Sequence, residues 1–293
     1  MIFVQAAITG ALVGGLYALM AIGMSLTWGM LKVINLAHFG LILLSAYLTY
    51  ELAANAGIDP LLTTVVTVPV MFLIGVAIQW GYQRFAVSEL SSLLVSFGLL
   101  IIGIQLISNT WSADFRRMAS DVNPYATGSL SIGPLVFPMP TLIASGAAVA
   151  LVVLIHVVLA RTFVGRALRA FSEDPAIASA FGIDHRRLGI LLAGAAGATG
   201  AVAGTLFAIG GSLTPSTAFE WFGVVFAVVI LGGIGNVLGT LLAGALVGGI
   251  AGVTTIAWSS VAAPVVVYSL VVLALLFRPN GLLPRRGGHG GHG

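Results

Sequence analysis

The sequence has no cysteine and few charged residues. Charged residues make up 7% of its 293 positions, whereas an average soluble domain carries about 25%. Without cysteine, the chain forms no disulfide bond and offers no thiolate to a metal ion. Because 59% of the residues are hydrophobic and the mean hydropathy is +1.10, the composition indicates a protein that crosses a lipid bilayer several times.

The motifs of several enzyme classes are also missing. The sequence contains no HExxH metal motif, no GxSxG nucleophile turn and no GxxxxGKS/T phosphate loop. Its nine acidic residues lie mostly outside the apolar runs, so no pair of carboxylates stands within a span as a proton relay requires. We therefore expect a protein that is not an enzyme, has no catalytic residue, metal or cofactor, and draws any transport energy from a partner. The net charge of +3 gives no reason to expect a nucleic-acid partner.

The apolar runs predict an all-α, polytopic membrane protein with about nine transmembrane helices, within a range of eight to ten. The expected spans cover residues 3–31, 41–52, 61–80, 91–108, 139–160, 188–209, two arms within 221–257, and 258–277. The two arms are separated by the sequence GGIGN at 232–236. No basic segment precedes the first apolar run, so we expect a first span there and not a cleaved signal peptide.

Basic residues gather on one side of this arrangement. If residues 161–187 are cytoplasmic, alternation of the spans places ten of the twelve basic residues in the cytoplasm and only Arg116 and Arg117 outside. The N-terminus is then outside and the C-terminus is cytoplasmic. Residues 1–284 are expected to form a single transmembrane domain, and the Gly/His-rich tail 285–293 to be disordered. Metal binding by His289 and His292 is the less favoured alternative for that tail.

The segment 161–187 holds five of the twelve basic and three of the nine acidic residues. Asp174 suits a helix N-cap, Pro175 the first helical position and Gly182 the left-handed residue past the end, which predicts a short helix between them. Its apolar side is made of Ala176, Ile177, Ala180 and Phe181. The pattern fits a docking surface for a partner in water and equally fits an amphipathic loop that lies on lipid headgroups.

A few polar residues near the apolar runs are candidates for a solute pathway: Asn35, His38, Glu220 and Asn236. Polar groups inside a membrane are costly and often functional. The alternative for Asn35 and His38 is that they cap helix ends or bond a neighbouring helix. Glu220 begins an apolar arm on the outer side.

Two segments, 18–38 and 226–244, each pair an apolar arm, a break containing Asn and a second arm. Transporters often contain repeats with broken helices near the pathway, although a similarity this short also arises by chance. Glycines at four-residue spacing form two further sets that predict close helix packing. These sets are Gly10 with Gly14, and Gly244 with Gly248 and Gly252.

Four stretches resemble the shorter membrane permease subunits of bacterial branched-chain amino acid ABC importers. GLYALMAIGMSLTWGMLKVINLAHFGLILLSAYLT at 15–49 is similar to the N-terminal signature of that family, and GRALRAFSEDPAIASAFGID at 165–184 is similar to its cytoplasmic loop. FAVVILGGIGNVLGTLLAGALVGGI at 226–250 and FRPNGLL at 277–283 are similar to its C-terminal signature. In one departure, His38 is followed by Phe39, Gly40 and Leu41, where relatives commonly have His-Gly-Asp or His-Gly-Glu.

The resemblance implies a type II-like ABC importer permease in the bacterial cytoplasmic (inner) membrane, which forms half of a pathway that works by alternating access. The expected partners are a second permease subunit of a longer type, two ATP-binding ATPase subunits and an extracytoplasmic solute-binding protein. The residues expected to dock on the ATPase are Asp174, Pro175, Ala176, Ile177, Ala180, Phe181 and Gly182. The expected solute is a branched-chain amino acid, and the missing carboxylate leaves urea or another small polar solute as the alternative.

Two other classes are less favoured. A stand-alone channel or secondary carrier would move solute without an ATPase, and the shortage of acidic residues in the spans argues against ion coupling. An intramembrane enzyme would need a nucleophile and a base within reach of each other. His38 and His156 are the only histidines in the expected spans, and no serine motif accompanies them.

Overall fold

The computed structural model describes residues 1–277 and 281–283, apart from the side chains of Pro175 and Ala176. The expected tail 285–293, with its two histidines, lies outside the described residues. The elements are α1 (Ile2–Leu31), α2 (Ala37–Ala56), α3 (Thr64–Arg84), α4 (Glu89–Trp111), β1 (Ser129–Ile132), β2 (Leu135–Pro138), α5 (Met139–Arg161), α6 (Phe163–Glu173), α7 (Pro175–Ala180), α8 (His185–Gly210), α9 (Thr217–Gly232), α10 (Val237–Ala257) and α11 (Ala262–Phe277).

Nine apolar helices account for most of the described chain, as the sequence predicts. Seven of them, α1 to α5, α8 and α10, are long and apolar enough to span a membrane. The other two, α9 and α11, have 16 residues each, or about 24 Å at the rise of an α-helix, which is short of the hydrocarbon thickness. The break expected at 232–236 does separate α9 from α10. These helices confirm the all-α, polytopic fold class.

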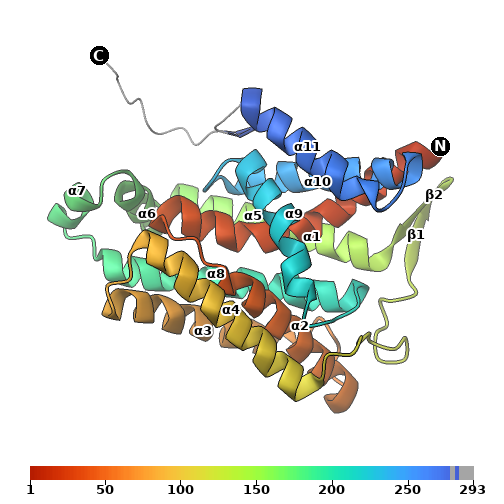
Figure 1. Ribbon diagram of the computed structural model, residues 1–293, viewed down its shortest axis with the longest axis horizontal. Helices are drawn as coiled ribbons and strands as arrows, with labels where there is room; N and C mark the ends of the chain where they lie inside the picture. The colour runs from red at the N-terminus through yellow and green to blue at the C-terminus, as the bar shows by residue number, and fades with distance from the viewer. Residues whose placement is uncertain (278–280, 284–293) are drawn as a thin grey trace.

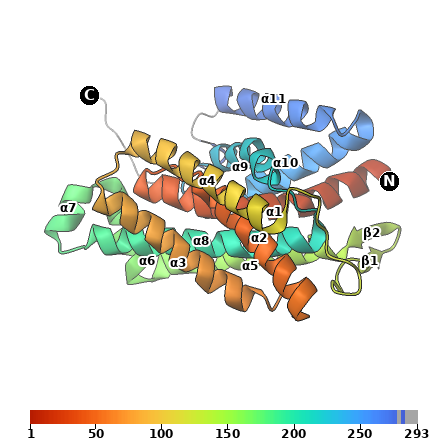
Figure 2. The ribbon, with the colours of Figure 1, turned by 60° about the horizontal axis from the view of Figure 1, so that its bottom comes forward.

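The long axis of the molecule separates two polar ends. Figure 1 shows α6 and α7 at one end, and the N-terminus with β1 and β2 at the other. The same ends stay apart when the molecule is turned by 60° (Figure 2). Helix α1 runs between them and contacts α5, α8, α9 and α10, so these four helices pack around it.

Glycine explains why α1 and α10 lie so close together. A Cβ atom on Gly14 would overlap the carbonyl oxygen of Gly244, and one on Gly10 would overlap that of Gly248. In lipid, helices associate through such close packing because there is no hydrophobic force between them. The packing role predicted for these glycines is therefore confirmed. Glycine also allows close packing of α8 on α3, where a Cβ atom on Gly197 would overlap the Met71 carbonyl oxygen.

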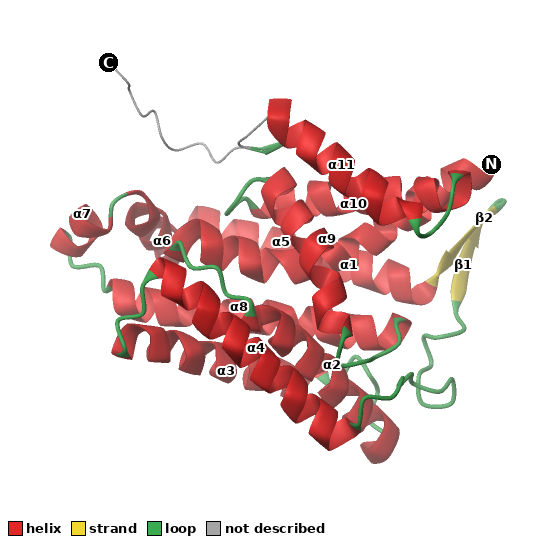
Figure 3. Ribbon diagram, viewed as in Figure 1, coloured by secondary structure: helices red, strands yellow, loops and turns green. Residues whose placement is uncertain are grey.

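The connection between α4 and α5 contains a feature that the sequence reading missed. Strands β1 and β2 form an antiparallel hairpin around Gly133, whose φ of 59° suits the turn (Figure 3). The rest of the connection is tied to the helices: Arg116 forms a β-bridge with Leu213, and the side chain of Asn123 donates to the Ile209 carbonyl oxygen at 2.8 Å. The long weakly hydrophobic stretch is thus ordered and covers helix ends on the hairpin side of the molecule.

Candidate functional site

Helix α7 has a cap at each end. At its start, the backbone N–H of Ile177 donates to the Asp174 carboxylate at 3.0 Å. At its end, Gly182 has a φ of 79°, and its N–H donates to the Ser179 carbonyl oxygen at 3.0 Å. The N–H of Ile183 reaches back to the Ala178 carbonyl oxygen at 3.2 Å, which completes a Schellman motif. The short helix that the sequence predicts therefore exists, and it covers Pro175–Ala180.

The apolar side chains of this helix divide between the protein and the solvent. Ala178 is buried, whereas Ile177 and Phe181 are 58% and 84% exposed. These two residues are four positions apart, so they lie on one face of the helix, and Ala180 beside them is also exposed. A soluble surface rarely leaves two large apolar side chains together in water without a partner. The helix thus presents a small apolar surface at one end of the molecule.

The structure places a second helix, α6, in the segment where the sequence reading expected a loop. Thr162 caps it by accepting from the Gly165 N–H at 3.2 Å. Leu168 is buried, while Phe163 and Arg166 on the other side are exposed, so the helix is amphipathic. The signal was present as a Thr cap followed by apolar residues at helical spacing, but the arginines between them concealed it. Helices α6 and α7 together form the platform that follows α5.

The first predicted break lies between α1 and α2. Residues 33–36 are not helical, and the Ser96 hydroxyl of α4 bonds their backbone: the N–H of Leu36 donates to it at 3.0 Å, and it contacts the Ile34 carbonyl oxygen at 3.3 Å. The side chain of Asn35 accepts from the Ala37 N–H at 3.1 Å. Irregular backbone survives among membrane helices only where it is satisfied in this way.

His38 is buried, with 3% of its surface exposed. Its Nε2 atom lies 3.0 Å from the carbonyl oxygen of Met20 on α1. The ring fits because Gly23 of α1 and Gly200 of α8 have no Cβ atom, and such an atom on either would crowd it. In this conformation the imidazole joins α1, α2 and α8.

Phe39, the residue after His38, packs against α9. Its ring lies 4.4 Å from that of Phe222 and 6.4 Å from that of Phe226, both on α9. Trp28 of α1 contacts Phe226 from the other side, with ring centroids 6.0 Å apart. The aromatic ring is fully buried, so hydrophobic packing joins α2 to α9 at this point.

The second break lies between α9 and α10 and is held by Asn236. The Asn236 side chain accepts from the Gly239 N–H at 2.9 Å, as an N-cap does, and donates to the Leu283 carbonyl oxygen at 2.7 Å. The N–H of Gly235 donates to the Ser25 hydroxyl of α1 at 3.1 Å. Both breaks therefore use an asparagine to satisfy the first turn of the following helix, and both lie beside α1.

The four pathway candidates do not form one cluster. Asn35 and His38 adjoin each other at the start of α2, whereas Asn236 lies by Ser25 at the second break. Glu220 is exposed in the first turn of α9, with no ion-pair partner among the described residues. Those residues also contain no group of three or more His, Cys, Asp or Glu side chains that could hold a metal ion.

The C-terminal ends of α2 and α4 hold a polar cluster that sequence reasoning did not find. The indole of Trp111 donates to Glu51 at 2.8 Å, and the guanidinium of Arg116 donates to the Trp111 carbonyl oxygen at 2.7 Å. Nearby, the Tyr125 hydroxyl donates to Asp59 at 2.9 Å. Burial and the neighbouring carboxylate raise the pKa of that phenol. Such contacts cross about 60 residues of sequence, so no local pattern announces them.

The fold and the site define a helical membrane protein with two helix breaks beside a central helix and a short, exposed helix at one end. A comparison with known families makes this class specific. Residues 6–277 match the family described as "Branched-chain amino acid transport system / permease component". The chain therefore belongs to this permease family.

Individual relatives agree with the family match. The chain is 27% identical to the high-affinity branched-chain amino acid transport system permease protein BraD of Pseudomonas aeruginosa, over 97% of this chain and 96% of the relative. The identity and coverage are the same for LivH of Escherichia coli K12. A probable LivH of Methanocaldococcus jannaschii is 26% identical over 82% of this chain and 77% of the relative. No solved structure matched the chain.

Proposed function

We propose that this chain is a permease subunit of an ATP-driven ABC importer for branched-chain amino acids and forms half of the solute pathway. Family membership supports a transport subunit, and the names of the relatives supply the solute class. The observation that carries the mechanism is the doubly capped helix α7, which exposes Ile177 and Phe181. A permease without a phosphate-binding loop needs such a contact to receive work from an ATPase.

The proposed assembly contains two permease subunits, of which the other is a longer homologue, and two ATPase subunits on the α7 side. An extracytoplasmic solute-binding protein delivers the solute to the end that carries the β-hairpin. In this arrangement residues 1–284 form one transmembrane domain in a bacterial inner membrane, with the N-terminus outside and the C-terminus in the cytoplasm. The platform of α6 and α7, within residues 161–187, transmits motion of the ATPases to the spans, and this motion produces alternating access.

We assign the docking residues two roles. Asp174, Pro175 and Gly182 shape α7, while Ala176, Ile177, Ala180 and Phe181 contact the ATPase. The pathway candidates Asn35, His38, Glu220 and Asn236 are proposed to position or line the route of the solute. Asn35 and Asn236 act through the two breaks, because their side chains hold the backbone there.

The test is to place a carboxylate on the exposed face of α7. Ile177→Asp and Phe181→Asp should each lower copurification of the ATPase subunits at least tenfold, because a buried unpaired charge opposes docking. Uptake of radiolabelled leucine by cells that express the whole transport system should fall in parallel. Phe115→Asp is the matched control, since Phe115 is also 84% exposed but lies at the opposite end. Unchanged copurification in both α7 variants would overturn the docking role of α7.

A further inference from the structure

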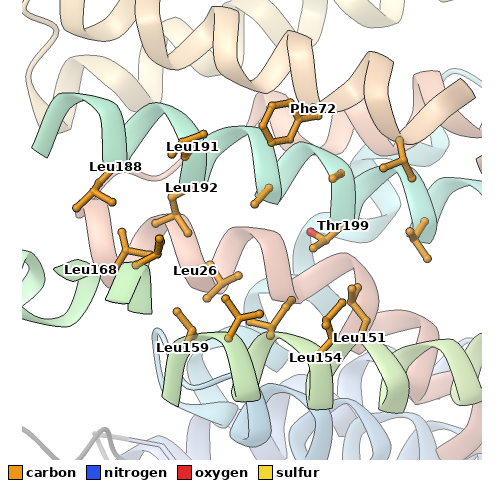
Figure 4. A pocket seen from close by; sticks show the side chains of 17 residues that line it. Leu26, Phe72, Leu151, Leu154, Leu159, Leu168, Leu188, Leu191, Leu192 and Thr199 are labelled. Atoms are coloured by element: carbon orange, nitrogen blue, oxygen red, sulfur yellow. The ribbon is translucent and has the colours of Figure 1, made fainter. Parts of the chain in front are cut away.

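An apolar crevice separates α5 from α3 and runs along α8. Its volume is about 460 Å³, and side chains of α5 and α8 face each other across it (Figure 4). Residues from five helices line it, among them Leu26, Phe72, Leu154, Leu168, Leu192 and Ala198. The single polar residue of the lining, Thr199, bonds its hydroxyl to the Ala196 carbonyl oxygen of its own helix at 2.8 Å. Nothing in the lining can bind a polar solute.

The crevice continues toward the outer side. A second cavity of about 580 Å³ lies between the same three helices and shares Val68 and Val202 with the first. Along α8 the two extend from Leu188 to Leu206, which is about 27 Å at the rise of an α-helix. This length is close to that of the hydrocarbon core of a bilayer, which is about 30 Å.

The volume of the crevice decides between two apolar occupants, a partner helix and a single hydrocarbon chain. The first cavity extends from Leu188 to Val202, or about 21 Å along α8. A partner helix of that length, about 10–12 Å wide, would occupy roughly 2,000 Å³. Even all of the space between atoms at the crevice, about 1150 Å³, is little more than half of this. A single hydrocarbon chain is narrow enough to fit, because its carbon atoms pack at about 4 Å from their neighbours.

Two exposed arginines lie next to the α6 end of the crevice. Leu159, Val164 and Leu188 line this end. Arg161 ends α5 two residues after Leu159, and the guanidinium of Arg166, from the side of α6 opposite Leu168, lies 3.4 Å from the Arg161 carbonyl oxygen. Neither arginine has an acidic partner within ion-pair distance in the described part of the chain. A guanidinium group binds phosphate through paired hydrogen bonds, so exposed arginines at headgroup level favour an anionic lipid.

We propose that the crevice between α3, α5 and α8 holds an acyl chain of an anionic phospholipid, with its phosphate at Arg161 and Arg166. The lipid comes from the leaflet on the α7 side. Its chain fills the space between α5 and the rest of the bundle, while the headgroup contacts the platform of α6 and α7. This binding site is additional to the proposed transport function and does not depend on the identity of the solute.

Native mass spectrometry of the full chain in its transport complex tests the headgroup. The complex is purified in detergent, and phosphatidylglycerol or phosphatidylcholine is added. We expect one phosphatidylglycerol to be retained per chain in preference to phosphatidylcholine. Arg161→Gln and Arg166→Gln should each weaken phosphatidylglycerol binding about fivefold and leave phosphatidylcholine binding unchanged. Arg117→Gln removes the same charge at the opposite end and should bind as the unmodified chain does. Equal retention of the two lipids would overturn the headgroup assignment.

A second pair of variants tests the acyl chain. Ala198→Phe fills the floor of the crevice and should abolish retention of either lipid, whereas Ala150→Phe, at an exposed position of α5 outside the lining, should not. Melting temperatures of both variants show whether each is folded. Undiminished lipid binding by folded Ala198→Phe would overturn the proposal. The proposal would also be overturned if Ala198→Phe lost the second permease subunit and still bound lipid as before, because that result assigns the crevice to a protein partner.

Discussion

At the scale of single residues, the closest contacts in the molecule depend on the absence of a side chain. Gly14 and Gly244 bring the backbones of α1 and α10 together, and each would push the other away if it carried a Cβ atom. Glycine costs helix stability in water, so its presence inside a long helix needs a packing reason. Here the reason is close contact between helices in lipid, which no larger residue allows.

Gly14→Ala should therefore destabilise the protein by about 1–3 kcal/mol, the cost of overpacking a core. The measurement is the melting temperature of the purified chain in detergent. Gly98→Ala is the matched control, because a Cβ atom on this glycine of α4 meets nothing within 4 Å. The control should melt at the same temperature or slightly higher, since alanine favours helix by about 1 kcal/mol. Equal melting of the two variants would contradict the packing role.

The Ser96 hydroxyl has a comparable role at the first break. It is the hydrogen-bond partner of the Leu36 N–H, in a segment where no helix satisfies the backbone. Ser96→Ala should lower stability by about 1–3 kcal/mol, because a buried N–H loses its acceptor. Ser92→Ala provides the comparison: Ser92 is buried on the same helix but bonds only the Glu89 carbonyl oxygen. Chemical unfolding followed by tryptophan fluorescence should separate the two variants, and equal unfolding midpoints would show that the Ser96 bond is dispensable.

At the scale of elements, α7 is short enough to depend on its caps. Isolated helices of this length are unstable in water, so each end bond contributes a large share of the stability. Asp174→Ala should cost about 1 kcal/mol and speed amide exchange in α7 about fivefold. Hydrogen–deuterium exchange of the peptide that covers α7 measures this. Asp184→Ala, which removes the cap of α8, should leave that rate in α7 unchanged. Equal exchange in α7 before and after Asp174→Ala would contradict the capping role.

The elements also show which features a sequence can predict. The limits of α7 were readable because Asp174, Pro175 and Gly182 act on backbone within a few residues of themselves. The breaks were readable because glycine and asparagine interrupt apolar runs. The hydrogen-bond partner of the first break could not be predicted, since Ser96 lies 60 residues from Leu36 along the chain. Helix α6 was missed because its arginines concealed the helical spacing of its apolar residues. The hairpin was missed because its stretch of the chain is only weakly hydrophobic.

At the scale of the whole molecule, a membrane crossing by α5 puts the hairpin and α7 on opposite sides of the membrane. The absence of cysteine makes this orientation testable, because a single introduced cysteine is the only thiol in the chain. Phe115 and Ala180 are exposed near the two ends, and Ile234 lies exposed within the second break. Labelling at these three positions shows the membrane side of three segments: the connection between α4 and α5, helix α7, and the break between α9 and α10.

A membrane-impermeant maleimide should label Phe115→Cys in intact cells. It should label Ala180→Cys and Ile234→Cys only after the membrane is broken, because ten of the twelve basic residues favour the cytoplasm for that side. Labelling of Ala180→Cys in intact cells would reverse the orientation and place α7 where no ATPase can reach it. Labelling of Ile234→Cys alone would mean that α9 does not cross the membrane. The second break would then open toward the outside, and the chain would make eight crossings with both termini on the same side.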